Sequence, residues 1–175
     1  NQSNLLLYLH KLETTVRSHP MVEDAAVFLT IDGWLKTRIK QRTPIARVIS
    51  ETSSYYIDKQ AKTMPLSQNH AARVPIISGK IDEADTKMIF ELVMKIMSDE
   101  FLKKQIVGIR KIANGEFILD TRIGNQQIVI GRIEGLNHKF KNLSAFYNKA
   151  KKDNTIADFS IVNVKFNNQV VCTKR

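Results

Sequence analysis

One stretch of the sequence decides the fold: Lys40-Gln41-Arg42-Thr43-Pro44-Ile45-Ala46-Arg47-Val48, followed shortly by Ser54-Tyr55-Tyr56-Ile57-Asp58. Its first half has the pattern of a strand end, an Arg-Thr-Pro connection and the start of a second apolar strand. An aromatic strand closed by an aspartate comes next. Because proline is disfavoured inside a central strand, the connection predicts a junction between two small structural units. The stretch carries no catalytic side-chain pattern, and this favours a binding scaffold over an enzyme.

The composition is that of a folded, soluble chain. Hydrophobic residues make up 43% and charged residues 25% of its 175 residues, which suits one or two small domains with modest cores. No apolar run approaches the roughly 20 residues of a transmembrane helix. Because the chain opens at Asn1 without a methionine, we expect it to be an excised part of a longer protein. The single cysteine, Cys172, excludes an internal disulfide framework.

Upstream of the junction, the pattern predicts a helix followed by a hairpin. Four apolar residues recur at helical spacing over residues 4–18: Leu5, Leu9, Leu12 and Val16. Pro20 ends this helix. Alternating apolar residues over 25–31 predict a strand, and Asp32-Gly33 is a strong hairpin turn that leads to a partner strand over 34–41. This unit is too small to hold a core alone.

Downstream of the junction, the pattern predicts an antiparallel sheet with two helices. The helices cover residues 82–98, with Asp82 as the cap, and residues 136–150. The strands cover residues 45–50, 55–58, 74–78, 104–113, 117–122, 126–133, 159–166 and 169–174. The turns Asn114-Gly115 and Gly124-Asn125 connect three of them into a meander. The predicted fold class is therefore α+β, with one unit over 1–43 and a second over 44–175.

A search for catalytic or metal-binding patterns finds none that specifies a site. The four histidines are scattered, without the spacing of a zinc site. No Gly-rich phosphate loop and no Gly-x-Ser-x-Gly elbow occurs. Asp82, Glu83 and Asp85 form one tight acidic cluster, which we interpret as favourable charge at a helix N-terminus rather than a cation site. Cys172 lies in an apolar strand and should behave as a small hydrophobe. The sequence thus indicates no enzyme, cofactor or metal.

The net charge of +10 and the pI near 9.8 leave two interpretations. A basic chain can be a nucleic-acid-binding module, or it can present a solvated basic surface to acidic partners. Lysines and arginines are spread along the whole chain, with only short clusters such as Lys149-Ala150-Lys151-Lys152. We also find no aromatic signature of base stacking. The pattern therefore favours the second interpretation, with the nucleic-acid module as the alternative.

The last predicted strand, residues 169–174, ends in positive charge at Lys174 and Arg175. A strand at a sheet edge carries unpaired backbone donors and acceptors that a partner strand can complete. Terminal charges also discourage uncontrolled pairing. The alternative is a strand that merely completes the sheet, and the residues alone leave both open. If the edge binds a partner, a proline at Val170 or Val171 should abolish binding while the domain stays folded.

Several stretches resemble one known family, and their order along the chain is specific to it. They are His19-Pro20-Met21-Val22-Glu23-Asp24-Ala25, Asp32-Gly33-Trp34-Leu35, Gln41-Arg42-Thr43-Pro44-Ile45-Ala46-Arg47, Tyr55-Tyr56-Ile57-Asp58, Met64-Pro65-Leu66-Ser67, Arg73-Val74-Pro75-Ile76-Ile77-Ser78-Gly79 and Val162-Asn163-Val164-Lys165-Phe166 with Asn168-Gln169-Val170-Val171. Over almost its whole length the chain resembles the extracytoplasmic part of the FtsQ/DivIB bacterial cell division proteins, in the form found in Bacteroidota.

The resemblance implies a truncated POTRA-like domain over residues 1–43 and a β domain over 44–175. It implies a single-pass protein of the inner membrane whose periplasmic part is a non-enzymatic divisome scaffold. The implied partners are FtsB- and FtsL-like proteins, with no nucleic acid. In relatives, FtsB docks by adding a strand to the end of the β domain. This maps the partner-binding residues onto Phe166, Asn168, Gln169, Val170, Val171 and Cys172.

The sequence departs from the family pattern at a few positions. Ala61 stands where a turn glycine is expected. Asn163 replaces an aspartate of the final strand, and Asn168-Gln169 replaces small residues. These departures leave the predicted fold intact but change side chains near the expected partner site.

Overall fold

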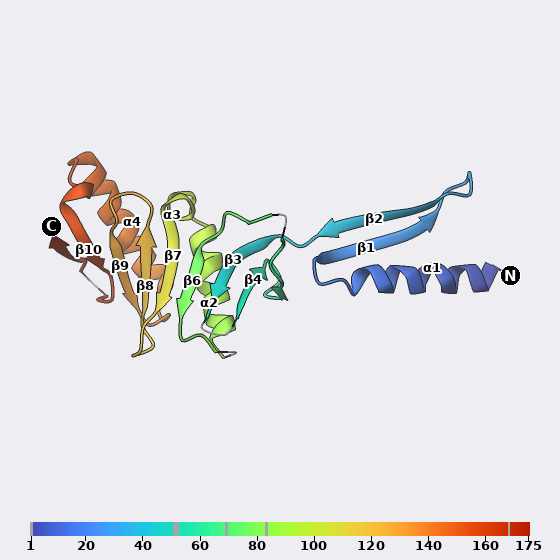
Figure 1. The fold of residues 1–175 in the computed structure, drawn as a ribbon. Helices are drawn as coiled ribbons and strands as arrows, with labels where there is room; N and C mark the ends of the chain where they lie inside the picture. The colour runs from blue at the N-terminus through green and yellow to red at the C-terminus, as the bar shows by residue number, and fades with distance from the viewer. Residues whose placement is uncertain (1, 51–52, 69, 83, 168) are drawn as a thin grey trace.

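The computed structural model describes residues 2–50, 53–68, 70–82, 84–167 and 169–175. Within these residues the chain forms four α-helices, a two-stranded sheet and a nine-stranded sheet. Figure 1 shows two units arranged end to end, with the chain termini at opposite ends of an elongated molecule. The predicted α+β class with a mostly antiparallel sheet is confirmed.

The N-terminal unit consists of α1 (Gln2–Arg17), β1 (Val22–Leu29) and β2 (Leu35–Gln41). Helix α1 packs on β1, which buries Ala25 and Val27 beneath it. The hairpin turn lies where the sequence predicts it, and Gly33 adopts a φ of +80° that suits glycine. Strand β2 is exposed along all seven of its residues.

The larger sheet has the strand order β11-β10-β9-β8-β7-β6-β3-β4-β5. Its strands are β3 (Pro44–Ile49), β4 (Ser54–Asp58), β5 (Thr63–Met64), β6 (Ile76–Gly79), β7 (Ile106–Lys111), β8 (Phe117–Thr121), β9 (Gln127–Gly131), β10 (Phe159–Asn163) and β11 (Val171–Lys174). Three pairings are parallel: β3 with β6, β6 with β7, and β9 with β10. Parallel neighbours need a long crossover connection, and helices supply it between β6 and β7 and between β9 and β10.

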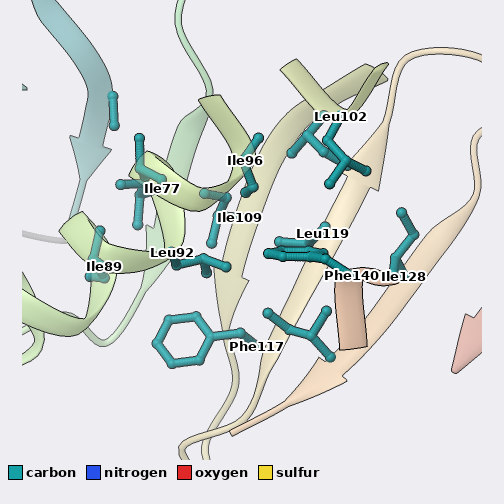
Figure 2. Packing of buried hydrophobic residues seen from close by; sticks show 14 of the residues in the cluster. Ile77, Ile89, Leu92, Ile96, Leu102, Ile109, Phe117, Leu119, Ile128 and Phe140 are labelled. Carbon is teal, nitrogen blue, oxygen red and sulfur yellow. The ribbon is translucent and has the colours of Figure 1, made fainter. Parts of the chain in front are cut away.

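The crossover helices are α2 (Asp85–Met97), α3 (Glu100–Gln105) and α4 (Leu136–Lys152), and they cover one face of the sheet (Figure 1). The core lies between these helices and the strands. Figure 2 shows Leu92 and Ile96 of α2, Leu102 of α3 and Phe140 of α4 packed with strand residues, all of them buried. Other labelled members of this core are Ile77, Ile89, Ile109, Phe117, Leu119 and Ile128.

The helical layer differs from the prediction at two points. Helix α2 begins at Asp85 rather than Asp82, although Asp82 Oδ1 still accepts from the Asp85 amide (3.2 Å). Helix α3 is additional, because the sequence pattern assigned the end of this segment to a strand beginning at residue 104. Asp99 caps α3 by accepting hydrogen bonds from the amides of Phe101 and Leu102.

The connection between the two sheets runs from Gln41 to Pro44 and is held by a buried ion pair. The Arg42 guanidinium lies 2.7 Å from the Asp58 carboxylate, whose side chain is 2% exposed. The backbone amide of Lys59 also donates to the Thr43 carbonyl (3.3 Å). Burial alone would raise the pKa of Asp58, but hydrogen bonds from Arg42 and from two backbone amides outweigh it and lower that pKa below its ordinary value.

Candidate functional site: the terminal edge strand

Strand β11 forms one edge of the nine-stranded sheet. Within the described part of the chain it pairs only with β10, antiparallel, with Cys172 opposite Val162 and Val171 opposite Asn163. The strand begins two residues later than predicted. It lies at the sheet edge, as a strand that binds a partner would, but a strand that merely completes the sheet could lie there too, so both alternatives stay open. Its role as a binding site stays a prediction.

The hydrogen bonds around β10 fix the direction of each backbone group in β11. The amide of Val164, just after β10, donates to the Val129 carbonyl of β9 (2.9 Å), so the neighbouring odd-numbered residues of β10 direct their amides to β11. The Arg175 amide donates to the Asp158 carbonyl (2.9 Å) on the β10 side. Both hydrogen bonds indicate that the odd-numbered residues of β11 direct their backbone amides to β10. The even-numbered residues therefore direct their amides outward.

Cys172 therefore directs its backbone amide and carbonyl away from the sheet, and Lys174 directs its amide away, whereas the Lys174 carbonyl accepts from Ser160 Oγ of β10 (3.4 Å). Successive side chains of this segment point to opposite faces of the sheet, and those of Val170 and Cys172 pack against the core. Burial raises the pKa of the Cys172 thiol, which keeps it protonated and unsuited to nucleophilic chemistry. Val171 lies on the opposite face and is 44% exposed. The edge thus combines open backbone groups with an exposed apolar side chain.

The remaining predicted site residues belong to the connection between β10 and β11. Phe166 is 44% exposed, a high value for a phenylalanine, and Gln169 is exposed as well. Asn168 lies outside the described residues. The structure therefore gathers the other five predicted residues in one chain segment that ends in the sheet edge.

Helix α4 anchors this connection from the helical layer. Asn142 Nδ2 donates to the Asn167 carbonyl (3.0 Å), and His138 Nε2 contacts the same carbonyl oxygen. The spacing of His138 and Asn142 in the sequence does not predict that they hold this connection. These contacts hold the chain to α4 at Asn167, the residue after Phe166.

A second anchor holds the connection where it leaves β10. The Lys165 amide donates to Asn163 Oδ1 (3.0 Å), so the asparagine supplies the acceptor oxygen that an aspartate would offer there. The Lys165 ammonium lies 2.8 Å from the Glu116 carboxylate of the neighbouring β7–β8 turn. Its hydrogen bond, with another from Asn114, lowers the pKa of Glu116.

A buried polar network fixes the start of the terminal hairpin. Gln126 is 1% exposed, and its Nε2 donates to the Ile156 carbonyl and to the Phe159 carbonyl (3.1 Å). Tyr147 of α4 donates its hydroxyl to Gln126 Oε1 (2.9 Å). The network joins α4, the short 3-10 helix η1 (Ile156–Asp158) and β10. The sequence pattern gave no signal for it.

Asp82 and Asp85 of the acidic cluster have a structural role at the start of α2. Asp85 is buried at the first turn of α2, and its carboxylate lies 2.5 Å from the Lys111 ammonium of β7. It also accepts from the Asp82 amide (2.9 Å). Burial would raise the pKa of Asp85, but these partners lower it. Glu83 lies outside the described residues.

An anchored edge strand beside exposed apolar side chains is typical of domains that bind a partner through their backbone. The family model described as FtsQ/DivIB, C-terminal related matches residues 43–173, which is most of the chain. The chain belongs to this family of FtsQ/DivIB-related proteins. The FtsQ/DivIB family consists of non-enzymatic scaffolds of cell division, which indicates a cell division role. A comparison with curated proteins finds no match to the chain.

Among the described residues, no helix combines the length and the apolar character needed to cross a bilayer.

Proposed function

We propose that this chain is a non-enzymatic divisome scaffold that binds FtsB- and FtsL-like partners by accepting a strand at β11. The observation that carries the proposal is the outward direction of the Cys172 backbone groups and of the Lys174 amide at the sheet edge. Membership of the FtsQ/DivIB-related family supports the division role. The same family relation supports a periplasmic position for this chain, with attachment to the inner membrane through a single helix outside this sequence.

The short length of β11 sets the chemistry of the partner. A strand of four residues offers few outward backbone groups, and each net hydrogen bond contributes only about 1 kcal/mol. Side-chain contacts must therefore add to the docking energy. Val171 of the edge strand and Phe166 of the connection before it are exposed apolar groups, so the partner strand should carry apolar residues that cover them.

Charge at the end of β11 would select among such partners. Lys174 forms no ion pair with any described residue. The Arg175 guanidinium donates to the Gly124 carbonyl. An acidic residue in the partner would gain from pairing with Lys174, whereas a second copy of this basic edge would be repelled.

The register indicates which substitution tests strand addition. A proline at Val171 would remove an amide that faces β10 and would disturb the sheet itself. Lys174→Pro instead removes an outward amide. We expect Lys174→Pro to weaken binding of a periplasmic FtsB–FtsL complex about tenfold in calorimetric titration.

Lys174→Ala is the matched control, because it removes the charge and keeps the amide; we expect it to weaken binding about threefold or less. Circular dichroism and the thermal midpoint would verify that both variants fold. Unchanged affinity of a folded Lys174→Pro variant would rule out pairing along β11. Failure of the unmodified chain to bind the complex would contradict the assignment of partners.

A further inference from the structure

A groove lies in the helical layer, between α4 and the segment that joins α2 to α3. Two hollows of about 290 Å³ and about 370 Å³ adjoin each other there. They share Asp99 of the α2–α3 connection and Ser144 of α4. One wall of the combined groove is therefore α4, and the other is the segment where α2 ends and α3 begins.

The α4 wall is a single stripe of the helix. Its lining residues follow at intervals of three or four, which places them on one helical face: Asn137, Lys141, Ser144, Asn148 and Lys151. At 1.5 Å per residue the stripe is roughly 20 Å long. An extended peptide of about six residues spans that distance.

Apolar and aromatic residues lie beneath the polar walls of the groove. Leu102, Phe140 and Tyr147 line it and are almost completely buried; Figure 2 shows Leu102 and Phe140 on the helical side of the core. Phe101 lies against Tyr147, with ring centroids 5.0 Å apart, yet it stays 42% exposed. The exposed part of Phe101 offers an apolar contact to an incoming side chain.

The rim of the groove is positively charged. Lys95, Lys141 and Lys151 line it, and none of them forms an ion pair with another described residue. Asp99 is the one acidic lining residue, and its carboxylate is already engaged as the cap of α3. Helix α4 itself contains no aspartate or glutamate. Among the described residues, Asp99 is thus the one negative lining charge against three lysines.

We propose that this groove binds an acidic peptide segment of a partner protein, with glutamate or aspartate at its rim and an apolar side chain against Phe101. Charge complementarity identifies the acidic character, and the exposed part of Phe101 identifies the apolar anchor. The site is separate from β11, so it does not depend on strand addition. Three rim lysines around this groove are a poor match for the long phosphate track of duplex nucleic acid.

The test uses a fluorescein-labelled synthetic peptide of about eight residues in which glutamate pairs alternate with leucine and phenylalanine. Fluorescence anisotropy would measure its binding to the full chain. Ser144→Trp fills the middle of the groove without changing the charge, and we expect it to weaken binding at least about tenfold. Ala145→Trp places the same side chain on the exposed neighbouring position of α4, and we expect it to bind as the unmodified chain does.

A second pair of variants separates the groove from general basic charge. We expect Lys141→Glu and Lys151→Glu together to weaken binding roughly tenfold. Lys149→Glu with Lys152→Glu makes the same charge change on the same helix outside the groove lining, and we expect it to weaken binding about threefold or less. The proposal is overturned if the unmodified chain does not bind the peptide, or if a groove variant binds it as tightly as its matched control. Tighter binding of a short DNA duplex than of the peptide would overturn it as well.

Discussion

Ala61 occupies a backbone conformation that suits glycine. Its φ is 61°, and its amide donates to the Asp58 carbonyl (3.1 Å) within the turn after β4. A residue with a Cβ atom pays about 1–2 kcal/mol for the left-handed region. We expect Ala61→Gly to raise the free energy of unfolding by about 0.5 kcal/mol, because relief of this strain exceeds the added freedom of the unfolded chain. Urea denaturation would measure the change, and a destabilised variant would contradict it.

At the scale of residues, the sequence predicts more about turns than about contacts. Ala61 stood out because a turn glycine was expected there, and Gly33 fell at the predicted hairpin. The partners of Gln126, His138 and Asn142 could not be predicted, because each reaches a backbone carbonyl far away in the sequence. Such contacts depend on the folded arrangement and leave no periodic signal.

At the scale of elements, the Tyr147–Gln126 network predicts how the terminal hairpin responds to alkaline pH. Burial raises the pKa of Tyr147 to about 12, against about 10 for a free tyrosine. Folding therefore favours the protonated phenol. Its contribution to stability is complete below about pH 10 and is lost as the pH rises through about 12. The two units of pKa correspond to at most about 3 kcal/mol.

We expect Tyr147→Phe to lower the free energy of unfolding at neutral pH by about 1 kcal/mol, because Gln126 Oε1 loses its donor. Above about pH 10, however, the stability of this variant should fall less steeply than that of the unmodified chain. Urea denaturation across the pH series would measure both effects. If the free energies of unfolding of the two proteins fell in parallel as the pH rose, Tyr147 would not titrate as described.

The elements themselves were predicted unevenly. Strands bounded by clear turn residues, such as β7, β8 and β9, were found to within a few residues of their ends. Helix α3 was missed, because six residues are too few to establish helical periodicity, although Asp99 followed by Glu100 is a cap signal. The parallel pairings were also missed, since turn chemistry identifies hairpins and says nothing about which distant strands become neighbours.

At the scale of the whole molecule, the Arg42–Asp58 pair joins two units that otherwise lie end to end (Figure 1). Removal of one partner leaves a buried charge without compensation. We expect Arg42→Ala to lower the free energy of unfolding by about 3 kcal/mol. We also expect it to widen the range of angles that the two units adopt relative to each other. Arg38→Ala is the control, because Arg38 is exposed on β2.

Chemical denaturation would measure the stability of these variants, and small-angle scattering would measure their dimensions. An Arg42→Ala variant with unchanged stability and radius of gyration would show that the backbone bonds of the connection suffice. The sequence located the change of sheet near Thr43-Pro44 but not the ion pair, since Arg42 and Asp58 meet only after β3 and β4 have paired.

The parallel crossover through α4 has a consequence for the time course of folding. The N-terminal hairpin can form from neighbouring residues, whereas β10 must wait until α4 has brought it alongside β9, and contacts of this long range form slowly. Because β11 pairs with β10, we expect it to be among the last parts of the sheet to form. A partner that docks on this edge would therefore engage only molecules that have completed their folding, and docking itself would discriminate against immature chains.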